Sequence, residues 1–415
     1  MPRLAPPANP VTIELEGEQF QACAGEPVAA ALVAEGETIF SRSPKYHRPR
    51  GPFCMSGACA HCLMRVDGVP NVPTCRVPVK SGMRLERQNA IPDARLDVFR
   101  ANDFVFRDWF NHHEFLAGVP IVEKVLQKIA RQLAGLGTLP DKPAPDRPPA
   151  TVEKLGIVIV GAGAAGLAAA KVFEARRVPY TLFERDAEVG GRLIGAAEVG
   201  QPAPWNAPAR THANVAGLFA DDGPPFLAII EHGALKLVFY EKLILANGGY
   251  PQLPTFPNND LPGVMAGRAV ATLIRRWGVL AGKTVACVGE PNEARALAEL
   301  VKNAGGTAVA IGEEPLRAHG LREVTAVTTN AGKRDCDVIA TCVPQSPAFE
   351  LARAAGAKVS WSSSARCFVV EADAVGRTSQ PNLFVAGELR GPMSSAAAAE
   401  QGLAVADHLC AGATP

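Results

Sequence analysis

The sequence predicts a multi-domain α/β protein, in which a small β-rich domain precedes a larger region of alternating strands and helices. Residues 1–98 hold short β-like runs, VTIELEG and CLMRVDGV, that are separated by turn-forming glycines. Strand and helix patterns alternate from residue 151 onward, which is typical of βαβ units around a parallel sheet. A length of 415 residues also exceeds what one ordinary hydrophobic core accommodates.

Composition limits the kinds of partner that we expect. The formal net charge of +1 gives no basic field, so neither nucleic acid nor an anionic membrane surface is an expected partner. No run of about 18 apolar residues could span a bilayer, and the opening MPRLAPPANP lacks the apolar core of a secretory signal. We therefore expect a cytoplasmic protein without a membrane span. Thiols stay reduced there, so clustered cysteines indicate metal binding rather than disulfides.

Four cysteines in the first domain form one spacing pattern. Cys54, Cys59, Cys62 and Cys75 read C-x4-C-x2-C-x12-C, and the first three match the loop of plant-type [2Fe–2S] proteins. The small residues between the first two let backbone N–H groups approach the cluster sulfurs. Zinc is the alternative, although a structural zinc site usually takes two close ligand pairs and Cys75 has no nearby companion. We predict a [2Fe–2S] ferredoxin-like domain over residues 1–98, with these four ligands.

The other cysteines are not expected to bind the cluster. Cys23 lies outside the loop pattern. The remaining five occur singly in apolar contexts, where buried and unreactive thiols are the simplest expectation. These are Cys287, Cys336, Cys342, Cys367 and Cys410.

A basic stretch, His47, Arg48 and Arg50, stands directly before the cluster loop. Two roles are compatible with it. The side chains tune the cluster or bind a nucleotide phosphate, or they pin the loop through salt bridges. Another histidine pair, His112 and His113, has no recognisable metal partners, so we expect it to pack within a loop. The sequence assigns no catalytic residue, because the chemistry would belong to cofactors.

Residues 99–150 connect the two regions. The apolar periodicity of VPIVEKVLQKIARQLAGL predicts an amphipathic helix over residues 119–136. The segment PDKPAPDRPPA that follows is rich in proline and predicts an extended linker.

A dinucleotide-binding motif opens the second region. The stretch IVIVGAGAAG predicts a strand followed by Gly161-x-Gly163-x-x-Gly166 at the start of a helix. The glycines allow a tight turn, the approach of a pyrophosphate and close packing of helix on strand. Eighteen residues after Gly166, Glu184 ends the next predicted strand, where it can accept hydrogen bonds from ribose hydroxyls and disfavours a 2′-phosphate.

A second nucleotide-type domain is predicted over residues 250–340, but its loop is degenerate. After Gly289 the chain reads Glu290-Pro291-Asn292-Glu293, so proline replaces the second glycine and two carboxylates face the expected phosphate position. Like charges repel, and proline has no N–H group to donate. We therefore expect no normal NAD(P)H site there, and a fold that persists as a scaffold.

Three further segments resemble two-dinucleotide flavoproteins of the disulfide-reductase type. They are GGR at 190–192, KLILANGG at 242–249 and NLFVAGELRGPMSSAAAAEQGLAVA at 382–406. The resemblance implies an FAD-type domain formed by residues 151–249 and 341–415, with the degenerate domain inserted between the two parts. It also adds four expected cofactor contacts, namely Gly191, Arg192, Gly387 and Glu388. Two departures are that Glu388 stands where aspartate is usual and that Asn247 replaces a threonine.

The whole chain resembles the α subunits of bacterial heteromeric amino-acid and amine dehydrogenases and oxidases. This family includes sarcosine oxidase, dye-linked proline and hydroxyproline dehydrogenases, opine oxidases and hydrogen cyanide synthase. Beyond the motifs above, the resemblance rests on SPKYHRPRGPFC (43–54), VDGVPNVPTCRVPV (66–79) and FPNNDLPGVMAG (256–267).

The resemblance implies an electron-transfer subunit of an oxidoreductase acting on CH–NH or CH–NH2 donors. The amine would be oxidised on a glycine-oxidase-like flavoprotein β subunit, and a further small subunit can accompany it. Implied cofactors are the [2Fe–2S] cluster, FAD or alternatively NAD or another nucleotide in the same fold, and FMN at a subunit interface. Two other functions stay open, a self-sufficient NADH-dependent acceptor reductase and a scaffold with a structural nucleotide. The segment 195–243 is short for the family, so the flavin wall is open, covered by a partner or lost.

Overall fold

A computed structural model describes residues 3–44, 46–90, 92–101, 140, 143, 146–195, 207–220 and 223–411. The helix predicted over residues 119–136 and the pair His112 and His113 lie outside the described residues. Contacts between Cα atoms divide the chain into two units. The first unit joins Met1–Ala144 with Leu253–Val343, and the second joins Pro145–Gln252 with Pro344–Pro415.

The first domain of the first unit is a five-stranded sheet packed against helix α1, and its strand order is β2-β1-β7-β5-β6. Strand β1 runs parallel to β7, whereas the other neighbours are antiparallel. All seven residues of α1 are buried, which makes this alanine-rich helix the centre of the domain core. The elements are β1 (Pro10–Leu15), β2 (Glu18–Cys23), α1 (Val28–Ala34), β3 (Ser41–Arg42), β4 (Pro49–Arg50), β5 (Leu63–Val66), β6 (Val69–Pro73), η1 (Thr74–Arg76), β7 (Arg84–Glu86) and η2 (Val98–Ala101).

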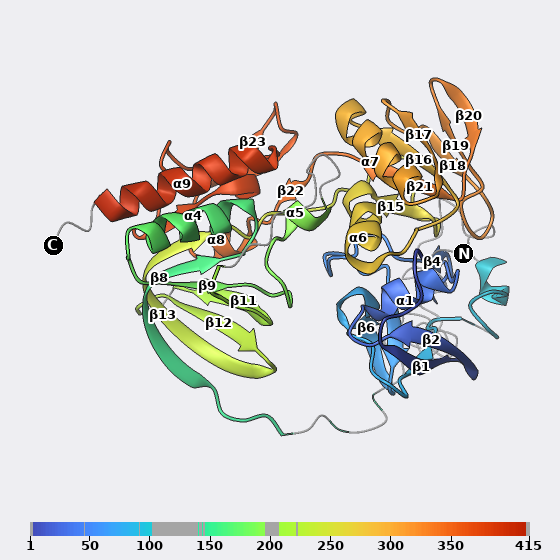
Figure 1. Ribbon diagram of the computed structural model, residues 1–415, viewed down its shortest axis with the longest axis horizontal. Coiled ribbons are helices and arrows are strands. Elements are labelled where there is room, and N and C mark those ends of the chain that lie inside the picture. Colours follow the sequence, from blue (N-terminus) through green and yellow to red (C-terminus); the bar gives the residue numbers. More distant parts are fainter. Residues whose placement is uncertain are drawn as a thin grey trace, which may run out of the picture. The chain divides into compact units, whose positions relative to one another are not determined.

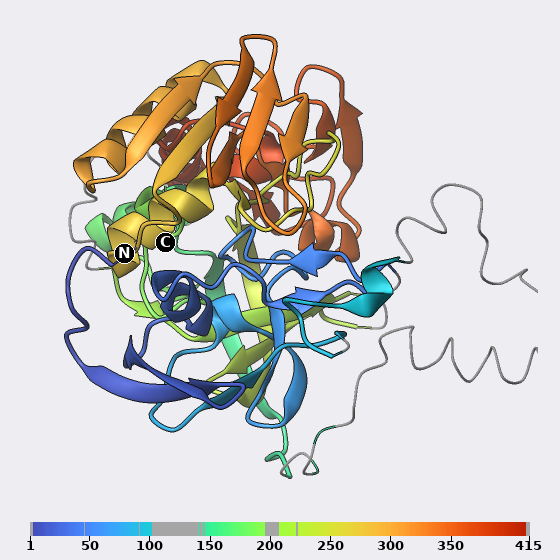
Figure 2. The ribbon, with the colours of Figure 1, turned by 90° about the vertical axis from the view of Figure 1, so that its right-hand side faces the viewer.

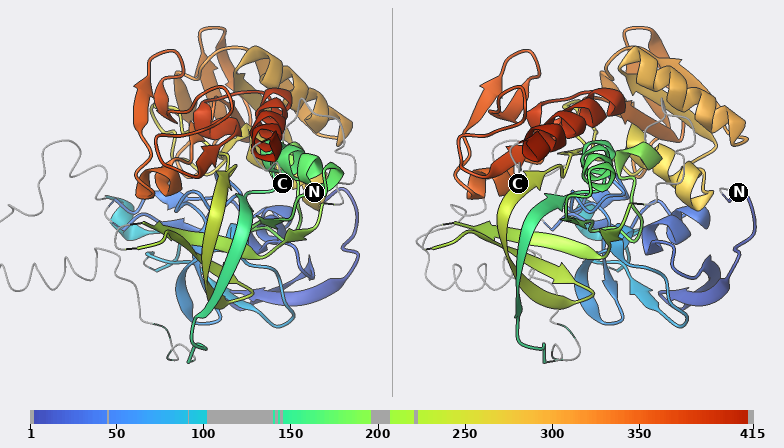
Figure 3. Two further views of the ribbon diagram at one scale, coloured as in Figure 1. Left: turned by 90° about the vertical axis from the view of Figure 1, so that its left-hand side faces the viewer. Right: turned by 60° about the vertical axis from the view of Figure 1, so that its left-hand side comes forward.

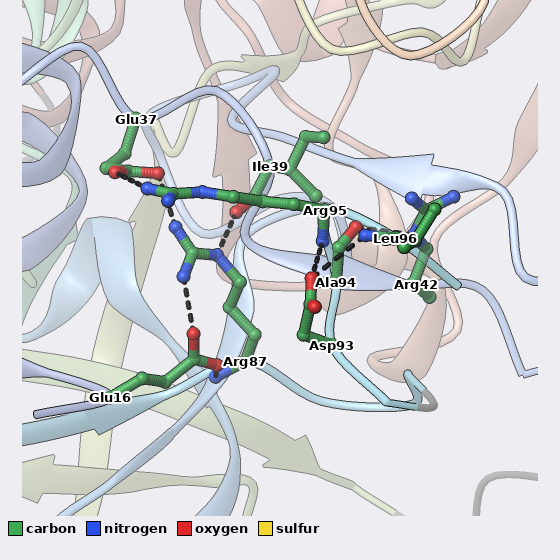
Figure 4. Close-up of polar contacts among 9 residues, drawn as sticks. All are labelled: Glu16, Glu37, Ile39, Arg42, Arg87, Asp93, Ala94, Arg95 and Leu96. Atoms are coloured by element: carbon green, nitrogen blue, oxygen red, sulfur yellow. Dashed lines mark hydrogen bonds and ion pairs between the residues drawn. The ribbon is translucent and has the colours of Figure 1, made fainter. Parts of the chain in front are cut away.

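A network of arginines fixes the chain where it leaves this sheet (Figure 4). The Arg87 guanidinium contacts the carboxylates of both Glu16 and Glu37, and Arg95 donates to Glu37 at 2.6 Å. The buried Arg42 donates through Nε to the carbonyl of Ala94 at 2.8 Å. These contacts hold the segment around residue 95 against Glu37 and Arg42, which lie far away in the sequence.

The second domain of the first unit is a parallel sheet with helices, as the alternating sequence pattern predicts. Its strand order is β15-β21-β16-β17, so β16 and β21 are central and consist almost entirely of buried residues. In Figure 2 the yellow and orange elements of this domain lie next to the blue strands of the first domain. Its elements are β15 (Val264–Ala266), α6 (Gly267–Trp277), β16 (Thr284–Gly289), α7 (Pro291–Asn303), β17 (Thr307–Ile311), β18 (Arg317–His319), β19 (Ala326–Thr329), β20 (Gly332–Asp335) and β21 (Val338–Cys342).

The second unit is built on a seven-stranded sheet in which β8 and β13 pair in parallel along most of their length. Strands β9, β10 and β25 add parallel neighbours, and β11 and β12 form an antiparallel extension. The sheet strands are β8 (Thr151–Val160), β9 (Tyr180–Phe183), β10 (Ala209–Arg210), β11 (Ala213–Phe219), β12 (Phe226–Glu231), β13 (Ala234–Leu245) and β25 (Leu383–Val385).

Helices α4 (Ala164–Ala175) and α9 (Ser395–Ala411) lie side by side on one face of this sheet (Figures 1 and 3). Glycine at position 402 permits their close crossing. A Cβ there would lie 2.0 Å from the carbonyl oxygen of Ala165. The smaller elements are α5 (Arg192–Gly195), β14 (Gly249–Tyr250), β22 (Ser346–Pro347), α8 (Glu350–Ala354), β23 (Val359–Ser362), β24 (Cys367–Val370) and η3 (Gly387–Arg390). Among the described residues, none of the helices has the length and apolar character needed to cross a bilayer.

Candidate functional site

The four cysteines of the spacing pattern come together in the first domain. The Cys59 thiol donates to the Cys54 sulfur at an Sγ–Sγ distance of 3.2 Å. The Cys75 thiol is within hydrogen-bonding reach of both Cys54 and Cys62. Three of the four sulfurs belong to buried residues, and only Cys59 is partly exposed. The structure therefore assembles the predicted donor set in one place, from a loop and from η1.

The hydrogen bonds among these thiols favour the thiolate form at two positions. The pKa of Cys54 lies far below its ordinary value, because its sulfur accepts from Cys59 and Cys75. The pKa of Cys62 is lowered by the bond from Cys75. The donors, Cys59 and Cys75, have raised pKa values for the same reason. Thiolate is the form of cysteine that binds metal, so this set suits an iron–sulfur cluster.

The cluster loop, residues 54–62, is shaped by small residues and backbone donors. The Ser56 N–H donates to the Cys54 sulfur at 3.4 Å. Gly57 has φ of +74°, and a Cβ there would lie 2.9 Å from the Arg76 side chain. Arg76 thus covers the loop from the position after Cys75. Backbone N–H groups that donate to the sulfurs stabilise negative charge on them.

The other cysteines lie outside this donor set. Cys287, Cys336, Cys342 and Cys367 are buried, as predicted, whereas Cys410 is only partly buried. Within the described ranges, no group of three or more His, Cys, Asp or Glu side chains, the four thiols included, is placed to hold a single metal ion.

The basic stretch before the loop forms salt bridges and a buried pair. Asp260 Oδ2 lies 3.2 Å from Arg50 Nη1 and 3.6 Å from Arg48 Nη1. The buried His47 holds Asp97 through Nδ1 at 2.7 Å, and its ring packs against Phe99. Of the two roles that the sequence left open, these contacts favour the pinning of the loop.

The dinucleotide motif folds as the sequence predicts, at the junction of β8 and α4. Gly161 has φ of +100°, and a Cβ there would lie 2.5 Å from the carbonyl oxygen of Ala246. A Cβ on Gly166 would lie 1.9 Å from the carbonyl oxygen of Gly161, so close packing of helix on strand requires glycine. A Cβ on Gly163 would meet nothing within 4 Å. Gly163 is the N-cap of α4, so open space lies where a pyrophosphate would approach the helix.

Glu184 lies beside this loop, at the end of β9. Its carboxylate accepts from the N–H of Ala162 at 2.8 Å and from that of Asp186 at 3.0 Å. Burial raises the pKa of Glu184, and these N–H donors partly offset that effect. Gly191 also lies here, because a Cβ on it would be 3.3 Å from the Cα of Gly163. The geometry suits the ribose and pyrophosphate of an adenine dinucleotide.

The remaining predicted contacts, Arg192, Gly387 and Glu388, gather at the other end of the same site. Arg192 Nη1 lies 2.8 Å from Glu388 Oε1, and the Glu388 side chain is 7% exposed. Arg192 also donates to the Met393 carbonyl. Gly387 donates its N–H to Gln401 at 3.0 Å. The carboxylate that replaces the usual aspartate is therefore held by an arginine of its own chain.

Two buried polar atoms near this pair lack a partner. Within the described part of the chain, Asn247 Oδ1 and Ser395 Oγ make no hydrogen bond. Asn247 follows β13 beside Gly161, and Ser395 begins α9. Buried polar atoms are nearly always hydrogen-bonded, so these two point to a ligand with polar groups.

The degenerate loop of the second domain is filled by its own side chain. Glu290 is the N-cap of α7, and its Oε2 accepts from the N–H of Glu293 at 2.7 Å. Pro291 occupies the first helical position. Glu290 thus caps the helix end where a pyrophosphate would bind, in addition to the repulsion that the sequence predicted.

Sequence reasoning missed three residues of these sites, Arg76, Asp97 and Asp260, and it missed the capping role of Glu290. A signal existed for Glu290, because proline at the next position is typical of a helix start. Asp97 and Asp260 act through partners 50 and 210 residues away, and no local pattern indicates such pairs.

Two family models match separate parts of the chain. Residues 8–90 match a 2Fe-2S iron–sulfur cluster binding domain. Residues 159–220 match an NAD(P)-binding Rossmann-like domain. The fold class predicted from the sequence, an iron–sulfur domain followed by a two-dinucleotide α/β region, is confirmed.

Similar proteins extend these matches. The sarcosine oxidase α subunit of Rhizobium meliloti is 26% identical over 456 residues, which cover 96% of this chain and 46% of that protein. Hydrogen cyanide synthase subunit HcnA of Pseudomonas aeruginosa is 37% identical over 79 residues, covering 19% of this chain and 75% of that protein. The chain spans less than half of the sarcosine oxidase α subunits that it matches. The crystal structure of L-proline dehydrogenase from P. horikoshii shares the fold, with a TM-score of 0.74, 19% identity and coverage of 99% of this chain and 75% of that one.

Proposed function

We propose a function from the premise that the chain belongs to the family of α subunits of bacterial heteromeric amino-acid and amine dehydrogenases and oxidases with an N-terminal [2Fe–2S] domain. The chain is an electron-transfer subunit of a cytoplasmic oxidoreductase complex. It receives electrons from a glycine-oxidase-like flavoprotein subunit that oxidises an amine or amino acid, and it passes them to an acceptor. A further small subunit completes the complex.

One observation carries this proposal, the assembly of four thiols in a chain that also has a complete dinucleotide loop. Cys54, Cys59, Cys62 and Cys75 would hold the [2Fe–2S] cluster. A bound flavin would take up an electron pair and could release it one electron at a time, and a [2Fe–2S] cluster would carry single electrons, so together they would split a two-electron oxidation into single steps. This combination supports electron transfer rather than substrate chemistry as the task of the chain.

We assign FAD to the dinucleotide site of the second unit. Open space at Gly163 admits a pyrophosphate, and Glu184 suits a ribose without a 2′-phosphate. The unpartnered Asn247 Oδ1 and Ser395 Oγ favour a ligand that extends beyond the ADP portion. Eight residues would contact it: Gly161, Gly163, Gly166, Glu184, Gly191, Arg192, Gly387 and Glu388.

The test is anaerobic purification of the complex, followed by visible and EPR spectroscopy and extraction of nucleotides. We expect a rhombic reduced [2Fe–2S] signal and FAD in this chain. Iron-free protein would refute the proposal. Cys59→Ser should abolish the EPR signal, whereas Cys23→Ser should leave it unchanged, because Cys59 contacts Cys54 and Cys23 lies outside the loop pattern.

A second candidate is a scaffold subunit in which the nucleotide is structural. The ion pair of Arg192 with the buried Glu388 favours it, because this carboxylate is already held by a cation of the chain. Reduction of this chain's flavin by an amine substrate in the complex would exclude the scaffold. Persistent oxidised flavin beside a fully reduced partner subunit would favour it.

A further inference from the structure

A backbone hydrogen bond joins the strand ends of the second domain to the first domain, and nucleotide binding does not explain it. The backbone N–H of Ala266, at the carboxyl end of β15, donates to the carbonyl of Phe53 at 3.1 Å. Phe53 directly precedes Cys54, the first cysteine of the cluster loop. In a parallel sheet of this kind, ligands bind at the carboxyl ends of the strands. Here that end of the sheet holds a segment of the protein itself.

Close packing and charge reinforce this attachment. A Cβ on Gly51 would lie 3.1 Å from the Cβ of Pro262, so the backbones of the two domains nearly touch. Asp260 is 16% exposed and faces Arg50 at 3.2 Å and Arg48 at 3.6 Å. These contacts attach the segment that directly precedes the cluster loop to the second domain.

A third polar contact joins the same two domains. Thr38 Oγ1 donates to Glu323 Oε2 at 2.7 Å. Thr38 also lines the tight space at Gly51, because its carbonyl oxygen lies 2.3 Å from a Cβ placed there. The contacts therefore spread over both the segment before β15 and the loop before β19.

The nucleotide position of the same domain is meanwhile closed. The Glu290 carboxylate occupies the N-terminus of α7 and takes the N–H of Glu293. Gly289, the one glycine left of the motif, is required by packing, because a Cβ there would lie 2.2 Å from the Cys342 carbonyl oxygen. Packing alone therefore explains why position 289 is glycine, and no ligand needs to be invoked.

We propose that residues 253–343 form a scaffold that positions the cluster loop and not a nucleotide-binding domain. Asp260 is a positioning residue that acts through Arg50. This inference rests on the proposed function only in that the loop carries a [2Fe–2S] cluster. The dinucleotide-type fold of this domain would then serve to hold a redox centre in one geometry. Electrons from NAD(P)H would then have no entry through this domain.

The test compares Asp260→Asn with Asp335→Asn, which removes the same charge from an exposed position of the same domain. In the full chain with its cluster, Asp260→Asn should broaden the reduced EPR signal through a spread of loop geometries. It should also lower the temperature at which the visible absorption is lost by about 2–6 °C. Asp335→Asn should match the wild type in both. Equal behaviour of the two variants would overturn the proposal.

A double-mutant cycle tests whether Asp260 acts through Arg50. If it does, Arg50→Gln combined with Asp260→Asn should cost no more melting temperature than the more harmful single variant. Additive losses would refute the coupling. The same cycle on iron-free chain separates this proposal from the proposed function, because the interface should still be measurable when no cluster forms.

A nucleotide titration tests the other half of the proposal. Gly163→Val fills the open space of the first dinucleotide loop, so any remaining site would lie in the second domain. We expect this variant to show no saturable binding of NADH by calorimetry. If Gly163→Val retained saturable binding of NADH, the assignment of the second domain as a scaffold for the cluster loop would be overturned.

Discussion

At the scale of single residues, the cluster loop combines a strained turn with a cation. Gly57 adopts a left-handed conformation, and the methylene groups of Arg76 lie within 2.9 Å of where its Cβ would be. A side chain at this position would therefore displace Arg76 and strain the turn. The consequence is that Arg76 can pack over the cluster loop only because residue 57 is glycine.

Arg76→Gln should lower the reduction potential of the cluster. A nearby positive charge stabilises the reduced, more negative state, and its removal should shift the midpoint potential downward by on the order of 50 mV. A redox titration followed by EPR measures this shift. Arg84→Gln, at an exposed position of the same domain, is the control and should leave the potential unchanged. An unchanged potential in Arg76→Gln would show that the guanidinium does not act on the cluster.

At the scale of elements, the sequence predicted the strands and helices whose formation depends on neighbouring residues. The run IVIV and the glycines after it predicted β8 and α4, because a strand buried on both faces and a tight turn each leave a signature in adjacent residues. The cysteine spacing likewise predicted four thiols that the structure brings together, and their role as cluster ligands stays a prediction. The pairing of Asp260 with Arg50 depends on two domains that meet across 210 residues, so no segment alone could indicate it.

The two glycines of the first loop should respond differently to the same added methyl group. Gly166→Ala places a Cβ 1.9 Å from a backbone oxygen, so it should destabilise the second unit by about 3 kcal/mol or more. Gly163→Ala meets nothing within 4 Å, so it should keep the melting temperature of the nucleotide-free chain while lowering the amount of bound dinucleotide. Thermal unfolding and nucleotide extraction measure both effects. Equal nucleotide content in Gly163→Ala and wild type would contradict the assigned phosphate position.

An ionic network at one end of the large sheet should make stability depend on pH. Glu231 accepts two hydrogen bonds from Arg210 and one contact from Lys236, and these lower the pKa of Glu231 to about 2. Because the pKa in the folded state lies below the ordinary value, the stabilisation is present above about pH 4.5 and is lost as the pH falls towards 2.

Glu231→Gln should therefore lower the free energy of unfolding at pH 7 by roughly 1–2 kcal/mol. The difference from wild type should shrink as the pH falls from 4.5 towards 2, which urea denaturation at several pH values measures. Glu371→Gln, at an exposed position of the same unit, serves as the control. A difference that stays constant down to pH 2 would show that the charge of Glu231 is not what stabilises the network.

At the scale of the whole molecule, the order of domains along the chain differs from their grouping in space. Residues 253–343 interrupt the dinucleotide-binding unit in sequence but join the iron–sulfur domain as one compact unit. The chain is thus divided into a unit that would hold the cluster and a unit that would hold the dinucleotide. In a complex of the proposed kind, both units would carry electrons that come from another subunit.

This division predicts which reductant can reach the cluster. An amine or amino acid should leave the purified chain oxidised, because the proposed oxidation site lies on the flavoprotein partner. The same substrate should bleach the flavin and produce the reduced cluster signal once that partner is added, as anaerobic visible and EPR spectra would record. NADH should fail in both cases, since Glu290 closes the second nucleotide loop. Rapid reduction of the chain alone by NADH would instead establish an acceptor reductase, and reduction by the amine alone would place the substrate chemistry in this chain.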